Sequence, residues 1–352
     1  MKILLIHNFY QYWGGEDSYV TSLKKLLEKN GHEVYLYSKD SKNIKTFWDK
    51  IKVGIGLFYN PWVEKELIKI IKEFKPDIVQ IQNIYPLITP IVYRVCKKFN
   101  IPIVQRISNF RWVCPKGLLF RKGKICELCV KKKFSYPSII FGCYHNSRIA
   151  TLLFSLSFYF YKLTGVFDLI DKIIFPTKFI QRYYLESIDF LSKNKTVVIP
   201  NFTLPEQNYS LKINNIGNYF IYVGRLSEEK GIISLLETFK SLPKVKLLII
   251  GDGPLGKKIN EYKEFKNIEF KQFLNRGMVK NYLSKAILCI VPSIGYDVFP
   301  NVIIESFSVG VPVILPNKSN FKNLIKNGKT GLYYDNNIYS KKNLTITIKK
   351  NS

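Results

Sequence analysis

KILLIHNFYQYWGGEDSYVTSLKKLLEKNGHEVYLYS, residues 2–38, is the stretch that decides the fold. Two short apolar runs, KILLIH and HEVYLYS, stand on either side of residues 17–30, whose apolar positions recur at helical spacing. A strand, a helix and a second strand in this order are typical of a βα unit in a parallel sheet. The start of the chain therefore predicts an α/β fold.

The same alternation continues through the chain and restarts once. Before the break, a helix is predicted at 62–74 and strands are predicted at 77–82, 102–107, 172–177 and 196–201. Residues 202–218 are polar and lack a clear period, so we interpret them as a linker. After them, a helix is predicted at 231–241 and strands at 219–224, 245–251, 286–293, 311–316 and 330–334.

Two α/β halves of this kind indicate two Rossmann-like domains facing a cleft. At 352 residues, the chain exceeds the size at which one hydrophobic core usually stops growing. We place the domain boundary between residues 1–203 and 204–352. Ligands of such sheets bind at the carboxyl ends of the strands, so the loops that follow strands hold the candidate site.

The composition is that of a folded and strongly basic protein. Hydrophobic residues make up 47% of the chain, which excludes a disordered protein. Lys and Arg number 54 against 26 Asp and Glu, a formal net charge of +28 spread over every segment. An anionic partner is expected, such as nucleic acid, an acidic membrane surface or a phosphorylated small molecule.

No targeting or membrane-spanning segment is predicted. The first residues hold only four consecutive aliphatic side chains before His7, too few for a signal peptide. The longest apolar run, IATLLFSLSFYFY at 149–161, is too short to span a bilayer and can either rest on a membrane surface or pack on its own domain. We expect a cytoplasmic protein, with the inner face of the membrane as one location.

Two of the loops that follow strands are rich in glycine. Gly14 and Gly15 precede a predicted helix, where backbone N–H groups can approach an anion. Gly251 and Gly253 follow a buried strand in LLIIGDGPL and permit a tight turn close to a ligand. A simple turn explains either pair equally well, and the second lacks the third glycine of a dinucleotide fingerprint.

The loop VGRLSEEKG contributes two cations, Arg225 and Lys230. At a strand exit, a guanidinium fork and an ammonium five residues away can both reach one diphosphate. Ser227 is expected to cap the helix that follows. Two solvated charges in a lysine-rich protein are the alternative interpretation.

The segment GYDVFPNVIIESFSVGVPVI, residues 295–314, sets two carboxylates, Asp297 and Glu305, in an apolar run. Asp297 lies in a loop after a buried strand, and a helix begins near Pro300. Helical spacing leaves Glu305 on one face and packs another against the sheet, formed by Ile303, Ile304 and Phe307. Each carboxylate can accept hydrogen bonds from two neighbouring hydroxyls, so one sugar ring and one ribose would satisfy both.

With these motifs in this order, the chain resembles the family 4 glycosyltransferases of the GT-B fold, of the bacterial polysaccharide type. Their E-x7-E pattern is matched by Asp297 and Glu305, and their diphosphate-binding loop by VGRLSEEKG. GGEDSYVTSLKKLLEKNGHEVYLY, residues 14–37, resembles their amino-terminal signature. The resemblance covers nearly the whole chain.

The resemblance implies transfer of a sugar from a nucleotide diphosphate sugar, with UDP or GDP, to a polysaccharide or lipid-linked acceptor. It implies that anomeric configuration is retained and that no metal or other cofactor takes part in catalysis. No DxD sequence is present to hold a divalent ion. Residues 1–203 would form the acceptor side, and residues 204–352 would bind the nucleotide sugar.

The resemblance also assigns roles to single residues. Arg225 and Lys230 would neutralise the leaving diphosphate. Glu305 would hold the ribose hydroxyls, and Asp297 would hold the donor sugar. Other positions expected to contact substrate are Gly14, Gly15, Gly251, Gly253, Phe299 and Asn301.

The chain departs from the family pattern in several places. Asp297 stands where glutamate is usual, so its contact with the sugar is expected to shift or to pass through water. Pro300 lacks an N–H that relatives often offer to phosphate, and Ser108 stands where many have a histidine. The segment after residue 334 is short, so we expect a fold shortened at the carboxyl terminus.

Four cysteines cluster in an expected insertion near residues 108–146, in the spacing C-x11-C-x2-C-x13-C. In a reducing cytoplasm such a cluster favours a structural zinc outside the chemistry. His145 in place of the last cysteine, an iron–sulfur cluster, or reduced thiols without metal are alternatives. The four cysteines are Cys114, Cys126, Cys129 and Cys143, whereas Cys96 and Cys289 are expected in the core.

Three other functions stay open from the sequence. A basic nucleic-acid-binding protein would explain the charge, but it would need Lys and Arg on one face, and we expect no nucleic-acid partner. A nucleotide-sugar epimerase of the same fold would need catalytic acids in the first half, where no clear set is seen. A glycoside hydrolase would need an acid of raised pKa beside a second carboxylate, and nothing marks one.

Overall fold

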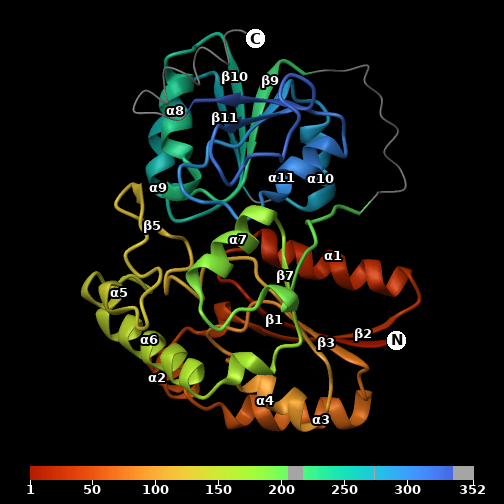
Figure 1. Cartoon of the computed structure of the whole chain (residues 1–352). Helices are drawn as coiled ribbons and strands as arrows, with labels where there is room; N and C mark the ends of the chain where they lie inside the picture. Colours follow the sequence, from red (N-terminus) through yellow and green to blue (C-terminus); the bar gives the residue numbers. More distant parts are fainter. Residues whose placement is uncertain (205–216, 273, 336–352) are drawn as a thin grey trace. The chain divides into compact units, whose positions relative to one another are not determined.

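The computed structural model describes residues 1–204, 217–272 and 274–335 (Figure 1). Its internal contacts divide the chain into two compact units. The first unit comprises residues 1–119 and 126–200, and the second comprises residues 120–125 and 201–352. Most of the predicted linker and the chain end after residue 335 lie outside the described residues.

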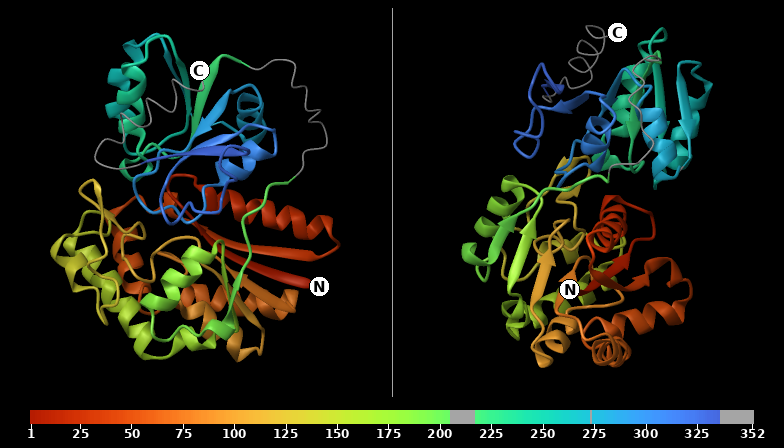
Figure 2. Two further views of the ribbon diagram at one scale, coloured as in Figure 1. Left: turned by 45° about the horizontal axis from the view of Figure 1, so that its top comes forward. Right: turned by 90° about the vertical axis from the view of Figure 1, so that its right-hand side faces the viewer.

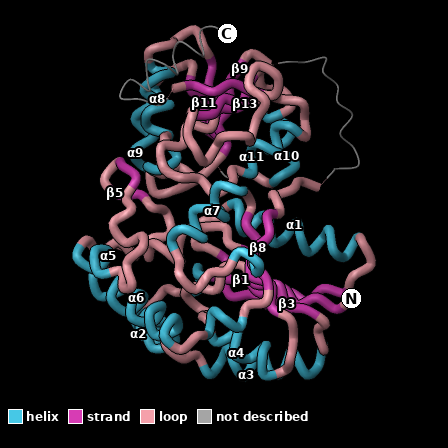
Figure 3. Tube along the Cα trace, in the orientation of Figure 1, coloured by secondary structure: helices cyan, strands magenta, loops and turns pink. Residues whose placement is uncertain are grey.

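The first unit is built on a parallel sheet of six strands, as the sequence predicts. The spatial order is β2-β1-β3-β4-β7-β8. Figure 3 shows β1 beside β3 in this sheet. On β1, Leu4, Leu5 and Ile6 are fully buried, which explains the continuous apolar run of a central parallel strand. In chain order the strands are β1 (Lys2–Phe9), β2 (Glu33–Asp40), β3 (Ile78–Ile81), β4 (Ile103–Arg106), β7 (Lys172–Phe175) and β8 (Thr196–Val198).

Polar side chains cap several helices of the first unit. Asn60 Oδ1 accepts the N–H of Val63 at 3.2 Å, and Ser147 Oγ accepts the N–H of Ala150 at 3.2 Å. Each bond satisfies a donor that a helix start leaves unpaired. The helices are α1 (Gly15–Lys29), α2 (Phe47–Gly56), α3 (Pro61–Phe74), α4 (Ile91–Lys98), α5 (Tyr136–Ile140), α6 (Arg148–Leu163) and α7 (Lys178–Ser187).

The second unit has its own parallel sheet, in the described order β11-β10-β9-β12-β13-β14. One of these strands, β11, was absent from the sequence prediction, because its residues alternate between apolar and charged as suits a sheet edge and do not form an apolar run. The strands are β9 (Tyr219–Val223), β10 (Lys246–Ile250), β11 (Ile268–Lys271), β12 (Leu288–Ile290), β13 (Val313–Pro316) and β14 (Gly331–Tyr334). The sequence pattern also missed a short antiparallel pair, β5 (Phe120–Arg121) and β6 (Lys124–Ile125).

Helices cover both faces of the second sheet (Figures 1 and 2). On one face, Phe220 and Tyr222 of β9 pack with α8 (Ile232–Lys240) and α9 (Gly256–Ile259). On the other, Ile221 packs with α10 (Arg276–Leu283) and α11 (Asn301–Phe307). Alternate residues of one strand thus enter two cores, which holds the carboxyl ends of the strands in a fixed frame.

Within the residues described, no helix is both long enough and apolar enough to cross a membrane.

Candidate active site

The candidate site of the second unit lies in the loops after β9, β10 and β12. The first two loops are joined backbone to backbone, because Gly224 N–H donates to Ile250 O at 3.1 Å and Leu226 N–H donates to Asp252 O at 2.9 Å. A Cβ atom on Gly251, which has φ +153°, would fall on the carbonyl oxygen of Gly224. There is no space for a side chain at Gly253 either, since an added Cβ atom would fall on the backbone of Leu226. The two glycines therefore let these loops pack closely.

The loop after β12 is fastened to the first of these loops. The N–H groups of Ile294 and Gly295 both donate to the carbonyl oxygen of Glu229, at 3.0 and 2.9 Å. Gly231, at φ +70°, has a carbonyl of Pro292 where a Cβ would stand. This close approach brings the side chains of Lys230 and Asp297 together as an ion pair.

Arg225 is held by a buried carboxylate that the sequence did not single out. Its Nη2 donates to Glu229 Oε1 at 2.6 Å, and Ser227 Oγ donates to the same oxygen at 2.6 Å. Ser227 does stand at the N-cap of the short helical turn Glu228–Lys230, as predicted, but its side chain makes no capping hydrogen bond. Burial acts to raise the pKa of Glu229, but Arg225, Ser227 and Lys230 outweigh it and hold the pKa below its usual value.

Asp297 is surrounded by hydrogen-bond donors besides Lys230. Ser293 Oγ lies 3.4 Å from its carboxylate, and Asn320 Nδ2 donates to its backbone oxygen at 3.2 Å. Lys318 Nζ donates to Ile294 O at 2.6 Å in the same loop. Burial lowers the pKa of Lys318 to about 8. No sequence pattern points to Lys318, which reaches the loop from beyond β13.

Glu305 lies on α11 and pairs with a cation that was not predicted. Its Oε1 is 3.4 Å from Arg276 Nε, and the Glu305 side chain is only 12% exposed. The buried face of α11 agrees in part with the expected one, since Ile303 lies in the core and Phe307 packs against it, whereas Ile304 is only half-buried. The buried residues of this helix are Val302, Ile303 and Ser306. Asn301, at the start of α11, accepts a hydrogen bond from Asn201 at 2.5 Å, and Phe299 is half-buried.

Gly14 and Gly15 lie in the first unit, at the start of α1. Gly14 N–H donates to Asp17 Oδ2 at 2.8 Å, and Asp17 Oδ1 lies 2.8 Å from His7 Nε2. His7 and Asp17 are both fully buried. The two glycines are therefore held in place by a buried pair that spacing alone could not reveal, because His7 and Asp17 stand ten residues apart.

Next to them lies a polar cluster at the ends of β1 and β4. Tyr10 Oη donates to Glu16 at 2.6 Å, and Asn109 Nδ2 donates to Tyr10 Oη at 3.0 Å. The Arg111 guanidinium lies over the Tyr10 ring, 5.9 Å from its centre. Burial and the Glu16 charge raise the pKa of Tyr10 well above its usual value. This cluster is not visible in the sequence, because Glu16 stands at the start of a helix and its partner Tyr10 lies in the preceding loop.

Comparison with known proteins decides the family. A family model described as "Glycosyl transferases group 1" matches residues 205–350. The alpha-monoglucosyldiacylglycerol synthase of Acholeplasma laidlawii is 30% identical over 350 residues, which cover 90% of this chain and 80% of that protein. The chain belongs to the group 1 glycosyltransferases. It is an enzyme of the glycosyltransferase class, as the motifs predict.

Other relatives of this group 1 glycosyltransferase support the assignment. The uncharacterized glycosyltransferase MJ1059 of Methanocaldococcus jannaschii is 31% identical over 265 residues, 71% of this chain, and the match spans 57% of that relative's length. Among solved structures, the sucrose-phosphate synthase of Thermosynechococcus elongatus superposes with a TM-score of 0.68 at 16% identity, covering 99% and 89% of the two chains. Anabaena HepE in complex with UDP superposes at 0.62, with 14% identity and the same coverage. These structures confirm the two-domain α/β GT-B fold.

The cysteines of this glycosyltransferase divide as predicted into core and cluster. Cys96 and Cys289 are fully buried. Burial first, and then the nearby thiol of Cys114, raise the pKa of Cys129 to about 12, with smaller contributions from Cys143 and Cys126. None of the four is part of a disulfide, and across the described residues no three His, Cys, Asp or Glu side chains are arranged to hold a metal ion.

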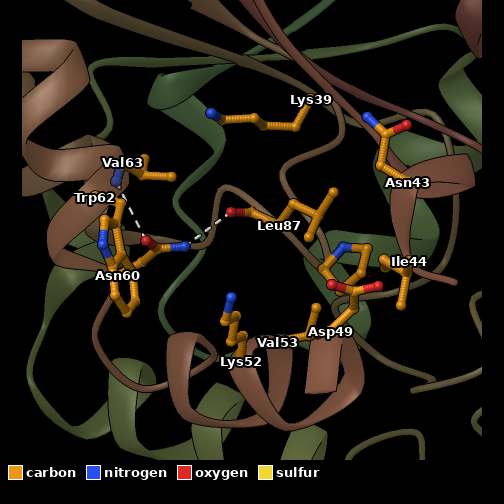
Figure 4. Close-up of a pocket in the computed structure, with 11 residues that line it drawn as sticks. Lys39, Asn43, Ile44, Asp49, Lys52, Val53, Asn60, Trp62, Val63 and Leu87 are labelled. Carbon is orange, nitrogen blue, oxygen red and sulfur yellow. Dashed lines mark hydrogen bonds between the residues drawn. The ribbon is translucent and has the colours of Figure 1, made fainter. Parts of the chain in front are cut away.

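A pocket of about 380 Å³ lies in the first unit, beside α2 (Figure 4). Asn60 spans it, because its side chain accepts from Val63 N–H and donates to Leu87 O at 2.9 Å. Lys39 and Lys52 add positive charge, while Ile44, Val53, Trp62 and Pro86 add apolar surface. The mixed lining suits a polar group attached to an apolar one.

Proposed function

We propose that this glycosyltransferase moves a sugar from a nucleotide diphosphate sugar to a glycan or lipid-linked acceptor, with retention of configuration and without a catalytic metal. The observation that carries the proposal is the joining of two strand-end loops by Glu229, which sets Lys230 against Asp297 with Arg225 close by. Structural neighbours that bind UDP and a relative named for a diacylglycerol product support the donor and acceptor classes.

The chemistry follows from how these charges are held. Departure of a nucleotide diphosphate develops negative charge, which fixed cations stabilise most in the transition state. Lys230 has three N–H donors and pairs with Asp297, so its remaining donors can bind a phosphate. Glu229 keeps Arg225 in place without a reorganisation at the moment of reaction.

The two carboxylates of residues 295–314, Asp297 and Glu305, would then bind different parts of the donor. Asp297, which is paired with Lys230, would bind hydroxyls of the transferred sugar. Glu305, which is paired with Arg276 of the neighbouring helix, would bind the ribose. We propose UDP as the donor nucleotide, with GDP as the alternative. The family match and the relatives favour neither a nucleic-acid-binding protein nor an epimerase.

The proposed contact between Glu305 and the ribose can be tested by removing one hydroxyl of the donor nucleotide. We expect Glu305→Ala to weaken UDP binding by about 10- to 100-fold, because a hydrogen bond to a charged group contributes about 1.5–3 kcal/mol. Removing the ribose 2′-hydroxyl should weaken binding to the unmodified enzyme by a similar factor, yet cost the Glu305→Ala enzyme almost nothing. Calorimetric titration of UDP, GDP and 2′-deoxy-UDP measures each case.

Glu269→Ala is the control for this titration, since Glu269 is an exposed carboxylate of the same unit that pairs with Lys271 at 2.7 Å. It should leave UDP binding unchanged. Equal losses for 2′-deoxy-UDP in the unmodified and Glu305→Ala enzymes would show that Glu305 does not hold the ribose. Absence of binding by any nucleotide would contradict the donor assignment itself.

We also propose that Cys114, Cys126, Cys129 and Cys143 bind one structural zinc ion outside the chemistry. Burial and neighbouring thiols disfavour the thiolate form of Cys129, as its raised pKa indicates. A bound cation would favour the thiolate instead. Binding would require the four side chains to rearrange, because in the described residues no three of them are arranged to hold a metal ion. The zinc would support an insertion that has little apolar core of its own.

Metal analysis of the purified protein tests the zinc site. We expect about one zinc per chain, lost in the Cys126→Ser/Cys129→Ser variant and kept in Cys96→Ala, whose thiol lies in the core. Cobalt substitution should give the absorption bands of thiolate ligands. A protein free of metal, whose four clustered thiols all react with a thiol reagent in the native state, would exclude the site.

For location, we propose the cytoplasm, with contact at the inner face of an anionic membrane. The alpha-monoglucosyldiacylglycerol synthase relative is named for a lipid, and the net charge of +28 favours an acidic surface.

A further inference from the structure

Three helices of the first unit, α2, α5 and α6, carry apolar side chains that the unit leaves uncovered. On α6 the exposed residues recur at spacings of three and four, so they form one stripe along the helix. Its opposite face, with Phe154, Ser157 and Tyr161, is buried. Of the 23 large hydrophobic residues exposed in the described chain, 12 belong to these helices or the residue after α5. They are Phe47, Trp48, Ile51, Ile55, Tyr136, Ile140, Phe141, Ile149, Leu152, Leu156, Phe160 and Leu163.

The three helices are neighbours, as Figures 1 and 3 show. Ser155 Oγ accepts a hydrogen bond from Ser135, before α5, at 3.0 Å, while Ser157 Oγ donates to Leu57 O, after α2, at 2.6 Å. By helical spacing, these two serines lie on opposite flanks of the α6 stripe. The stripe is therefore bordered by α5 on one side and by α2 on the other.

The exposed residues of α2 continue the same surface. Gly54 faces α6, because a Cβ on it would lie 3.5 Å from Leu153. Asp49, Lys52 and Val53 line the pocket. On a helical projection, the exposed Phe47, Trp48, Ile51 and Ile55 fall between these two flanks. The order around the surface is thus α5, α6, α2 and then the pocket.

The charge of this surface is almost entirely positive. Residues 128–163 contain five Lys and Arg and no acidic residue, and residues 41–63 contain four lysines and only one acid, Asp49. Lys131, Lys132 and Lys133 are exposed next to α5, and Lys50 and Lys52 are exposed on α2. A second copy of the chain would set like charges against each other in a symmetric contact. Exposed aromatic rings among lysines suit instead the interface of an anionic bilayer.

We infer that α2, α5 and α6 form a docking face that lies on the surface of an anionic lipid bilayer, with their apolar stripes in the interfacial layer. From the sequence, residues 149–161 could pack on their own domain or rest on a membrane. In the structure, one face of α6 is buried in the domain, and the opposite face is exposed and available to a membrane. The docking face reaches beyond that run to α2 and α5.

Docking in this way has a consequence for the acceptor, which rests on the proposed function. The pocket beside α2 would lie at the level of the lipid head groups, since α2 both lines it and carries the stripe. An acceptor anchored in the same bilayer could then present its polar head to Asn60 and Lys52 while its chains stay in the lipid.

Co-sedimentation with lipid vesicles tests the docking face without any sugar transfer. Vesicles of phosphatidylcholine, with and without phosphatidylglycerol, are compared at low and high salt. The unmodified protein should partition at least about tenfold more strongly onto the anionic vesicles, and high salt should weaken this binding. Trp48→Glu/Leu156→Glu should reduce it by about tenfold or more, because two apolar anchors are lost and two negative charges are gained.

Met278→Glu/Val197→Glu is the matched control, since both side chains are exposed and neither belongs to the docking face. A second pair, Lys50→Glu/Lys52→Glu against Lys257→Glu/Lys258→Glu, repeats the comparison without touching an apolar residue. Binding that is absent, indifferent to lipid charge, or reduced equally by test and control variants would overturn the inference. So would a dimer abolished by Trp48→Glu/Leu156→Glu.

UDP titration on the same samples separates this inference from the proposed function. Vesicle binding without UDP binding would keep the docking face and contradict the donor site. UDP binding without vesicle binding would support the donor site and contradict the docking face.

Discussion

Replacing Lys230 with alanine is expected to lower kcat/KM for sugar transfer by about 10²- to 10³-fold, as removal of one fixed charge stabiliser does in other active sites. The ammonium is the cation that the two joined loops set against Asp297, and the leaving diphosphate is where negative charge grows. UDP binding should weaken too, but less, because part of the loss is confined to the transition state. Steady-state kinetics and calorimetry on one preparation separate the two effects.

Asp297→Asn supplies the complementary measurement. It removes the carboxylate that shares Lys230 while keeping a side chain of nearly the same shape. If Lys230 serves the diphosphate and Asp297 the sugar, Asp297→Asn should keep or tighten UDP binding and still lose transfer. Lys257→Ala, an exposed lysine on α9, is the control. A Lys230→Ala enzyme that transfers sugar as well as Lys257→Ala would remove Lys230 from the mechanism.

The loops of the candidate site could be located in the sequence because they follow strands with strong sequence patterns. Central parallel strands such as β1 and β10 are buried on both faces, so they appear as unbroken apolar runs. The loops after them hold glycines and charges in an order that few proteins share. Asp297, Glu305, Arg225 and Lys230 could therefore be named as candidate residues from their place in these loops together with the family resemblance.

The charged partners of these residues could not be predicted, because the pairs are formed by tertiary packing and do not follow from positions in the sequence. Glu229 and Glu228 are neighbours in the chain, yet Glu228 is exposed while Glu229 is buried under Arg225. Arg276 reaches Glu305 because α10 packs on α11, 29 residues further along the chain. A sequence shows which side chains carry charge, but the pairing of charges belongs to the tertiary structure.

The docking face shows the same limit for apolar residues. The spacing of residues 149–163 indicates a helix with apolar positions on every side. Which side is covered depends on α2, which ends 92 residues before α6 begins (148 − 56), and on α5, which comes just before α6 in the chain. Only the structure shows that Phe154 is covered and Leu156 is not.

Asp17→Ala is expected to lower the free energy of unfolding of the first unit by about 3–5 kcal/mol, the usual cost of removing one partner from a buried pair. Both oxygens of this fully buried carboxylate are in use. Oδ1 meets His7 Nε2 at 2.8 Å and Tyr10 N–H at 3.3 Å, and Oδ2 accepts from Gly14 N–H at 2.8 Å. Alanine would leave these donors unsatisfied in the interior.

Glu28→Ala, on the same helix, is the control for Asp17→Ala. Glu28 is exposed and pairs with Lys24 at 3.1 Å, a contact expected to contribute at most about 0.5 kcal/mol. Because a chain of two units need not unfold in one step, hydrogen exchange over residues 1–30 is followed along with urea unfolding. The effect should appear first in the α1 amides, since Asp17 secures the start of that helix.

A companion variant, His7→Phe, decides whether the pair or the helix start accounts for the loss. If the pair dominates, His7→Phe/Asp17→Ala should cost about as much as Asp17→Ala alone, because the two residues share one interaction. If instead the hydrogen bonds from the N–H groups of Gly14 and Tyr10 dominate, the losses of stability caused by His7→Phe and by Asp17→Ala should add. An Asp17→Ala protein as stable as Glu28→Ala would mean that water replaces the carboxylate, and the buried pair would then not hold the glycine loop in place.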